Sequence, residues 1–171
     1  MSEEKKRREW AIAFLKDLAI AVIIFIGITA FIKPTVVRGD SMVSTLVNGD
    51  YVIALKQAYR MSEPKPGDII VFKSPVEDAL YIKRVIATEG QNVRVENGRV
   101  YVNENELNEE YIGEQYTDGD VSVTVPEDEV FVLGDNREVS MDSRDFGCVK
   151  ESSIKGKAAV RLFPDTKVLS D

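Results

Sequence analysis

The sequence predicts an all-β, mostly antiparallel body behind a single N-terminal transmembrane helix. The one long apolar run ends before Lys33, and the rest of the chain consists of short apolar or alternating runs separated by turn signals. Alternation with period two is typical of half-buried strands, and after Lys33 no helical pattern reaches ten residues. A chain of 171 residues is long enough to bury about 70% of its unfolded surface in one domain.

The first expected element is a membrane anchor. A basic cluster, Lys5–Arg8, precedes Trp10, and the run Leu18–Ile32 is apolar without interruption. That run alone spans about 22 Å of a hydrocarbon core of about 30 Å. Counted from Trp10, the segment is long enough to cross the core if Lys16 extends its amine to the headgroups.

We therefore expect a basic cytoplasmic N-terminus over residues 1–10, a transmembrane anchor over 11–32 and an extracytoplasmic body over 34–171. The orientation follows from the basic cluster, which stays on the cytoplasmic side of a membrane. Two alternatives remain open, a cleaved signal peptide and a buried core helix. The uninterrupted apolar run lies at the upper limit of length for the apolar region of a signal peptide, but no small-residue cleavage pattern follows it.

The body is expected to fold into nine strands joined by turns. Asn97-Gly98 is a favoured two-residue hairpin turn because both positions need a positive φ, and Lys65–Asp68 is a second turn. The hydrophilic stretch Asn103–Asp120 reads as part of a small insertion lobe over about residues 90–130. The runs that predict strands are Thr35–Arg38, Asp50–Leu55, Asp68–Lys73, Leu80–Thr88, Asn92–Val95, Val100–Asn103, Val121–Val125, Glu129–Leu133 and Lys157–Phe163.

The charge distribution argues against nucleic acid as a partner. The net charge is -7, with net +2 in residues 1–33 and net -9 in residues 34–171. Binding to phosphates depends on Lys and Arg side chains, which an acidic body does not concentrate. Residues 103–130 hold ten Asp or Glu and no Lys or Arg, a composition that predicts a solvated face or a flexible excursion.

The absence of histidine excludes several kinds of catalytic site. With no His and one Cys, the chain cannot form a Ser-His-Asp or Cys-His site, a His-ligated or thiolate zinc site, or an internal disulfide. Cys148 is expected to be a small, buried hydrophobic residue. No metal and no cofactor are expected.

A neutral lysine is the remaining nitrogen base. To act near neutral pH, such a lysine needs a pKa that burial has lowered by about 2–3. Lys83 fits, because it lies in the run Leu80–Ala87, whose two faces are both largely apolar and therefore predict burial. Arg84 projects to the opposite face and cannot serve as a base. The strand pattern by itself favours the alternative interpretation, a Lys83 that reaches solvent from an edge strand.

Serines occur in two turn-like segments that follow apolar strands. RGDSMVSTL, residues 38–46, contains Gly39, which permits a sharp turn and a close approach of backbone to a bound chain. A serine at such a turn, beside backbone N–H groups, is a workable nucleophile. GDNREVSMDSR, residues 134–144, holds two further serines. An ordinary turn and an ordinary surface loop with ion pairs are the alternative interpretations of these segments.

Three segments together resemble bacterial type I signal peptidases of the short, Gram-positive kind. GDSMVSTL (39–46), YIKRVIA (81–87) and GDNREVSMDSR (134–144) stand in the family's order behind an N-terminal anchor. GDYVIALK (49–56) and PGDIIVF (66–72) are similar to further family segments. The resemblance implies a membrane-bound serine endopeptidase that removes signal peptides from exported preproteins. It also implies a β fold shared with self-cleaving SOS-response repressors.

The resemblance also implies roles for individual residues. Ser41 matches the nucleophile of a Ser-Lys dyad, with its backbone N–H holding the oxyanion, and Lys83 matches the general base. Ser140 matches a serine that orients the lysine amine. Asp142 and Arg144 match a pair that braces the site.

Met42, beside the nucleophile, matches a residue near the substrate groove. Ser44 and Glu89 stand where the family usually has proline, and Val139 replaces a usual asparagine. Without proline, φ at Ser44 is not restricted in the unfolded chain, which is expected to lower the stability of the turn by about 0.4–1 kcal/mol. Gly39 carries no hydroxyl, so a side-chain oxyanion donor found in some members is absent.

Two rival functions remain. A soluble Ser-Lys autoprotease of the repressor type is disfavoured by the anchor and by the lack of a DNA-binding segment. A catalytically inactive, membrane-tethered β domain that only binds preproteins would be expected to lack Ser41 or Lys83, and both are present.

Overall fold

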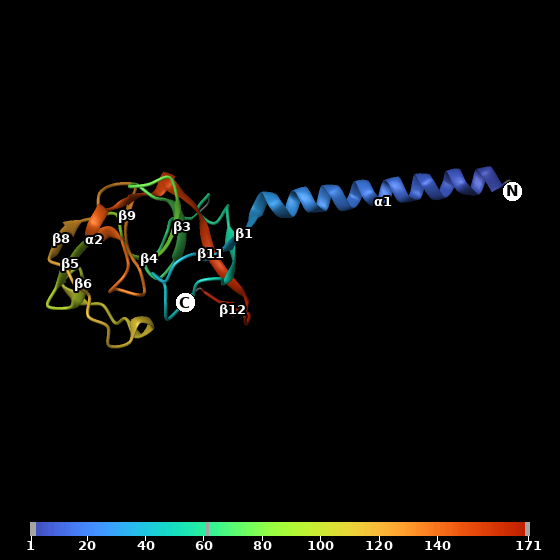
Figure 1. Cartoon of the computed structure of the whole chain (residues 1–171). Coiled ribbons are helices and arrows are strands. Elements are labelled where there is room, and N and C mark those ends of the chain that lie inside the picture. The colour runs from blue at the N-terminus through green and yellow to red at the C-terminus, as the bar shows by residue number, and fades with distance from the viewer. Residues whose placement is uncertain (1–2, 61, 170–171) are drawn as a thin grey trace.

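The computed structural model consists of a long helix that projects from a body of two antiparallel sheets (Figure 1). It describes residues 3–60 and 62–169; residues 1–2 of the expected N-terminus, residue 61 and residues 170–171 of the expected body lie outside the described residues. Helix α1 spans Glu3–Phe31. The described body has no α-helix of ten residues, so the all-β prediction with one N-terminal helix is confirmed.

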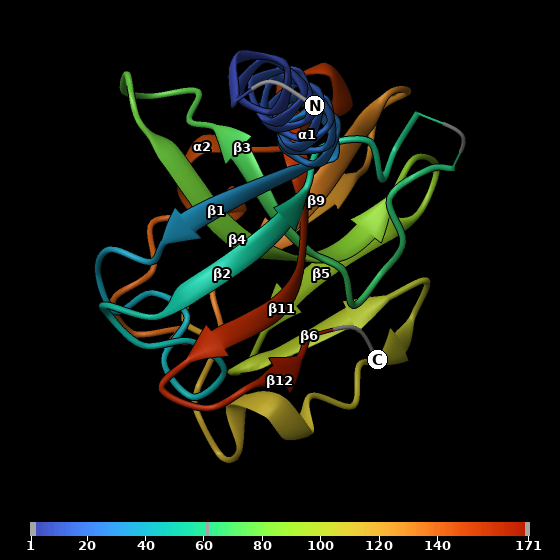
Figure 2. The same cartoon turned by 90° about the vertical axis from the view of Figure 1, so that its right-hand side faces the viewer.

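The larger sheet carries the strands that hold the motif segments. Its strand order is β1-β2-β11-β3-β4-β9-β10, with β12 paired to β11 (Figure 2). β4 pairs with both β3 and β9, so it lies in the interior of the sheet. The strands are β1 (Ile32–Val36), β2 (Tyr51–Leu55), β3 (Ile69–Lys73), β4 (Leu80–Thr88), β9 (Glu129–Leu133), β10 (Val149–Lys150), β11 (Ile154–Phe163) and β12 (Lys167–Val168).

The smaller sheet is formed by the insertion lobe, in the strand order β7-β6-β5-β8. Asn97 (φ 51°) and Gly98 (φ 82°) form the turn between β5 and β6 with the positive angles that the sequence predicts. The strands are β5 (Asn92–Glu96), β6 (Arg99–Val102), β7 (Asn105–Glu106) and β8 (Val121–Thr124), and the short helices of the body are η1 (Glu110–Ile112), α2 (Ser143–Phe146) and η2 (Glu151–Ser153).

The hydrophobic core lies on both faces of the larger sheet and under the lobe. One cluster joins the lobe to β4 and β9 through residues such as Val93, Val95 and Phe131. Another packs the turn after β1 against the sheet through Met42, Leu46 and other residues. Because both faces are covered, β4 is buried from Lys83 to Ala87, as its apolar pattern predicts.

All nine predicted strands are present, and the differences are three short additional strands and shifted strand ends. β7, β10 and β12 have two residues each, too few for alternation to reveal them. β11 begins at Ile154, where a bulge near Gly156 interrupts the alternation. β1 begins at Ile32, three residues before the predicted start. Ile32, expected in the membrane span, pairs instead with Leu55.

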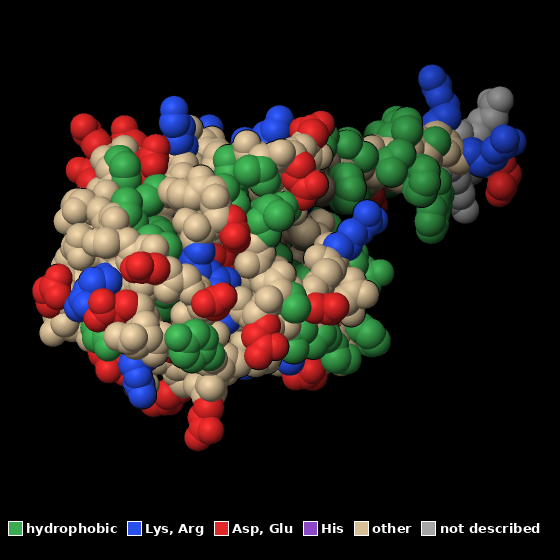
Figure 3. Space-filling view, turned by 60° about the vertical axis from the view of Figure 1, so that its left-hand side comes forward, with side chains coloured by type: hydrophobic (Ala, Val, Ile, Leu, Met, Phe, Trp, Pro, Cys, Tyr) green, Lys and Arg blue, Asp and Glu red, His purple; other side chains and the backbone are tan. Residues whose placement is uncertain are grey.

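Helix α1 is joined to the body without a linker. Within the described residues, Arg7–Phe31 is one helix that is long and apolar enough to cross a membrane, and its apolar side chains are exposed (Figure 3). Its last carbonyls accept hydrogen bonds from Lys56 and Gln57 at the end of β2: Lys56 Nζ donates to Thr29 O (2.7 Å) and Gln57 Nε2 to Ala30 O (3.2 Å). These donors satisfy carbonyls that a helix end otherwise leaves without partners.

Candidate active site

Two of the three motif segments contribute the serine and the lysine that line one open cleft, and the third contributes part of its wall. The cleft has a volume of about 1070 Å³. Its walls come from the end of β1 and the following turn, from the first half of β4, and from the loop after β9. Ser41 and Lys83, 42 positions apart in the sequence, both line it.

Ser41 lies at a turn held in place by the loop after β9. Gly39 has a φ of 85°, which the sharp turn requires. The backbone N–H of Asn136 donates to the Ser41 carbonyl (3.0 Å), and its side-chain amide donates to the Asp40 carbonyl (3.0 Å). The peptide units on either side of Ser41 are therefore fixed by a loop that is distant in sequence.

Lys83 is buried in an interior strand, which decides between the two alternatives that the strand pattern left open. Its exposed fraction is 3%. Burial lowers the pKa of Lys83 to about 8, opposed by the Asp142 carboxylate, which raises it, and assisted by Arg144. The amine lies 5.6 Å from the centre of the Tyr81 ring. At pH 8 the Lys83 amine is neutral in about half of the molecules, so it can accept a proton near this pH.

Arg84 projects to the face opposite Lys83, as predicted. Its guanidinium pairs with Asp135 (Nη2 to Oδ2, 2.7 Å), and both side chains are almost fully buried. Nη2 also donates to the Thr45 hydroxyl (3.3 Å), and Thr45 in turn donates to Asp135. Adjacent residues of β4 therefore do different work: Lys83 lines the cleft and Arg84 holds neighbouring loops together.

Ser140 lies beside the strand end that faces Ser41. It is 8% exposed, and its Oγ is buried without a hydrogen-bond partner among the described residues. A methyl group on Gly134 would lie 2.2 Å from this Oγ and 2.5 Å from the Ser41 carbonyl oxygen. The Oγ of Ser143, by contrast, has a hydrogen-bond partner, because it accepts from Val132 N (2.9 Å).

Asp142 and Arg144 form an ion pair at the base of the same loop. Arg144 Nε lies 2.8 Å from Asp142 Oδ1, with side chains 9% and 0% exposed. Asp142 also accepts from the backbone of Gly134 (3.1 Å) and caps helix α2. The pair thus connects the end of β9 with the segment that carries Ser140.

The position of Met42 requires a correction. The resemblance leads us to expect it near the substrate groove, but its side chain is 1% exposed and packs in the core with Val37, Leu46 and Ala158. It is not among the described residues that line the cleft. The turn directs Ser41 to the cleft and the following side chain inward.

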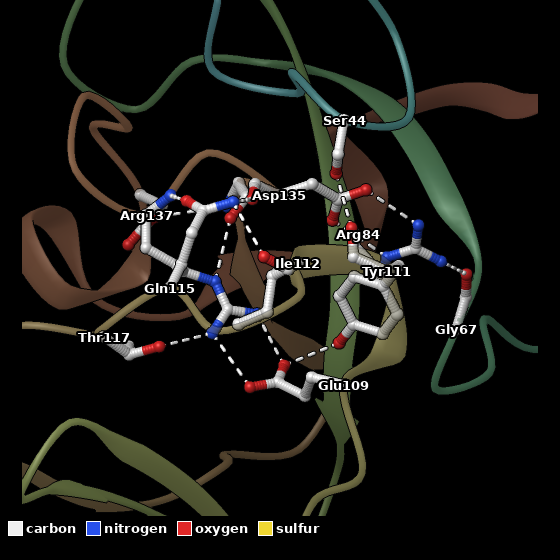
Figure 4. Close-up of polar contacts among 12 residues, drawn as sticks. Ser44, Gly67, Arg84, Glu109, Tyr111, Ile112, Gln115, Thr117, Asp135 and Arg137 are labelled. Carbon is white, nitrogen blue, oxygen red and sulfur yellow. Dashed lines mark hydrogen bonds and ion pairs between the residues drawn. The ribbon is translucent and has the colours of Figure 1, made fainter.

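Several residues of the site have no signal in the sequence that assigns them a role. Asn136 lies within a motif segment but is given no function there. Glu109 belongs to the acidic stretch expected to be solvated, yet its side chain is 8% exposed and pairs with Arg137 (Figure 4). For Glu109 that expectation is wrong. The adjacent apolar residues Tyr111 and Ile112 are the one indication in the sequence that this segment packs.

The remaining nucleophile, Cys148, is not activated. Burial raises the pKa of its thiol to about 11, so very little thiolate exists near neutral pH. Among the described residues, no group of three His, Cys, Asp or Glu side chains is arranged to hold a metal ion.

Comparison with known proteins identifies the family of this chain. The family described as "Signal peptidase, peptidase S26" matches residues 7–163. The probable signal peptidase I-1 of Synechocystis sp. is 39% identical over 90% of this chain and 85% of its own length. Signal peptidase I P of Bacillus subtilis subsp. natto is 33% identical over 95% of this chain and 94% of its own length.

A solved structure gives the same answer at the level of the fold. The signal peptidase I of Enterococcus faecalis is 34% identical, with a TM-score of 0.53 over 57% of this chain and 98% of that chain. Both the fold and the sequence thus relate this chain to signal peptidases. The chain belongs to the signal peptidase family, peptidase S26.

Proposed function

We propose that the protein is a membrane-bound serine endopeptidase that cleaves signal peptides from exported preproteins, with Ser41 as nucleophile and Lys83 as general base. The observation that carries this proposal is the shared cleft: a serine at a constrained turn and a buried lysine with a lowered pKa line the same groove. The signal peptidases it resembles suggest the substrate class.

The proposed reaction is acyl transfer in two stages. Neutral Lys83 takes the hydroxyl proton of Ser41 as the Ser41 oxygen attacks the scissile carbonyl carbon. Protonated Lys83 then donates that proton to the leaving amine as the peptide C–N bond breaks. Water, deprotonated by Lys83, attacks the acyl ester carbon. The bond to the Ser41 oxygen then breaks, protonated Lys83 returns the proton to that oxygen, and the signal peptide leaves with a free carboxylate.

The oxyanion is assigned to the backbone N–H of Ser41. The two hydrogen bonds from Asn136 fix the peptide units on both sides of Ser41, so this N–H is oriented before substrate arrives. Losing one preorganised donor typically reduces the rate by about 10²–10³-fold.

Ser140 is proposed to accept a hydrogen bond from the Lys83 amine, which would give its unpartnered Oγ a partner. The ion pair of Asp142 and Arg144 is proposed to brace this loop.

The substrate is proposed to bind as an extended strand. β1 is an edge strand of the larger sheet, and its end, Thr35–Val37, lines the cleft. An unpaired edge offers backbone N–H and C=O groups to an added strand. By resemblance to the family, small residues are expected at the first and third positions before the cut.

The anchor is proposed to hold the cleft at the outer membrane surface, single-pass, with residues 1–10 cytoplasmic, residues 11–32 as the anchor and the body over 34–171 extracytoplasmic. The basic residues before Trp10 favour this orientation. The lipid bilayer and preproteins bearing signal peptides are then the partners, and no metal or nucleic acid takes part.

The decisive test is cleavage of a preprotein by the purified full chain in lipid vesicles. Ser41→Ala and Lys83→Ala should each abolish processing, since the dyad acts as a unit. Lys83→Arg should be equally inactive because a guanidinium stays protonated. Circular dichroism spectra like those of the wild type would show that each variant is folded.

Processing near the wild-type level in either Lys83 variant would remove Lys83 as the base. Binding of preprotein without cleavage by the wild type would instead support a domain that only binds preproteins.

A further inference from the structure

A segment of the acidic stretch is packed against the site rather than solvated. Residues 109–117, here called the strap, connect β7 with β8. Thr117 and Ile112 are 1% and 7% exposed, and Figure 4 shows the strap's polar side chains directed toward the loops of the site. Such burial of polar groups is stable only where they find partners.

Arg137 clamps the two ends of the strap. Its side chain is fully buried, with Nη1 donating to Glu109 Oε2 (2.9 Å) and to the Thr117 hydroxyl (2.6 Å), and Nη2 donating to Glu109 Oε1 (2.5 Å). Gln115 adds a second bridge, accepting from Arg137 N (3.1 Å) and donating to Asp135 O (3.2 Å). A buried bidentate pair is strong and geometrically specific.

The contacts of Arg137 also fix the backbone at Gly134, beside which the Ser140 side chain lies. Arg137 Nε donates to the carbonyl of Gly134 (2.9 Å), the glycine against which the Ser140 Oγ rests. The Arg137 carbonyl in turn accepts from Arg144 Nη2 (2.8 Å). A shift of Arg137 therefore moves the peptide that determines where the Ser140 hydroxyl lies.

The middle of the strap holds the turn of Ser41. The Ser44 hydroxyl donates to the carbonyl of Tyr111. Ser44 has a φ of 99°, a left-handed conformation that proline cannot adopt. The turn therefore has a backbone conformation that a proline at position 44 would not allow. The hydrogen bond that Ser44 donates to the strap holds it in place. The Tyr111 ring also lies 3.9 Å from the Arg84 guanidinium, and its hydroxyl donates to Glu109 (2.6 Å).

We propose that the strap is a positioning element of the active site, with Glu109 as its central positioning residue. It contacts all three motif segments: the turn of Ser41 through Ser44, the strand of Lys83 through Arg84, and the loop of Ser140 through Arg137. Glu109 joins two of these contacts, since it accepts from both Arg137 and Tyr111. The inference rests on the proposed roles of Ser41 and Lys83.

The test compares Glu109→Gln with Glu110→Gln in the full chain. The two changes remove one negative charge each from neighbouring positions, but Glu110 is exposed, and among the described residues its side chain accepts a hydrogen bond from Asn108 alone. Glu109→Gln is expected to lower kcat about 10–100-fold with KM changed less than about twofold, because misplacement of catalytic groups by about 1 Å has costs of this size. Glu110→Gln should match the wild type in both constants.

Hydrogen exchange provides a readout that does not depend on activity. In Glu109→Gln, backbone amides of residues 39–46 and 134–144 should exchange faster than in Glu110→Gln, at a temperature where both variants are fully folded. If Glu109→Gln is too unstable, Tyr111→Phe removes only the hydroxyl bond to Glu109 and should shift kcat and exchange in the same direction by a smaller factor.

Unchanged kcat and unchanged exchange in Glu109→Gln would overturn the strap proposal, as would a loss of activity that appears only in KM. A wild-type chain that cleaves no preprotein would refute the proposed function instead. In that case the exchange contrast between the two variants still decides whether the strap holds the loops.

Discussion

Lys83 lines the cleft but is only 3% exposed, and this burial affects both stability and reactivity. Its pKa is about 8 in the folded chain against 10.5 for a solvated lysine. The folded state therefore binds fewer protons than the unfolded state between these values, and stability rises with pH across that interval. Below pH 8 the buried cation costs about 3 kcal/mol, which the proposed role as a base accounts for.

The same pKa predicts the pH dependence of cleavage. The value of kcat/KM should rise about tenfold per pH unit at acidic pH and level off above a midpoint near 8, the pKa of Lys83. Rates on a peptide substrate, measured between about pH 6 and 9.5, give the midpoint. A midpoint near that of a solvated lysine would mean that the base is not buried in the working protein.

Two serines of one loop should respond differently to alanine. Ser140→Ala is expected to lower kcat by about 10–10³-fold with KM little changed, since it leaves the Lys83 amine poorly aimed. Ser143→Ala removes the acceptor of the Val132 N–H, so it should lower the free energy of unfolding by about 1–3 kcal/mol and change kcat far less.

Kinetics on a peptide substrate and thermal unfolding of both variants separate these effects. If Ser143→Ala caused the larger loss of kcat, the assignment of the orienting hydroxyl to Ser140 would be wrong.

At the scale of elements, the junction between α1 and β1 sets where the body begins. The helix passes directly into a strand, and Ile32 and Lys33 pair with Leu55 and Ala54 of β2. A body beginning at Ile32 keeps this pairing, whereas one beginning at Pro34 loses two pairs at the edge of the sheet. We expect removal of residues 1–33 to lower the free energy of unfolding by about 1–2 kcal/mol relative to removal of residues 1–31.

Thermal unfolding followed by circular dichroism in the same buffer compares the two truncated chains. Equal midpoints would show that the first two residues of β1 contribute nothing once the helix is gone.

Features that depend on residues near each other in the sequence can be predicted from it, whereas features that depend on distant residues cannot. Strands such as β4 and the turn at Asn97-Gly98 follow from local periodicity and φ requirements, and both are present. The apolar run around Lys83 suggests burial but leaves an edge strand possible, and only the pairing of β4 with both β3 and β9 decides the question. The roles of Glu109 and Asn136 depend on partners 28 and 96 positions away, which no local pattern encodes.

At the scale of the whole molecule, the N-terminal segment and the body have opposite net charges, and the proposed function gives them separate tasks. Residues 1–33 carry net +2 and residues 34–171 net -9, so the body alone is repelled by an anionic membrane surface. The described residues that line the cleft all follow α1, and the chemistry proposed for Ser41 and Lys83 uses no group of the helix. The helix then contributes proximity to the membrane, which acts as a raised effective concentration.

Removal of residues 1–31 should therefore affect two substrates unequally. On a soluble peptide, kcat/KM should stay within about threefold of the full chain, because the cleft and its supporting loops are intact. On a preprotein inserted in vesicles the loss should exceed about tenfold, since proximity is gone. It should be larger for anionic than for zwitterionic lipid at low salt, because the acidic body is repelled. Parallel assays on the peptide and on both vesicle types measure these ratios, and equal losses on peptide and preprotein would show that α1 is part of the catalytic fold.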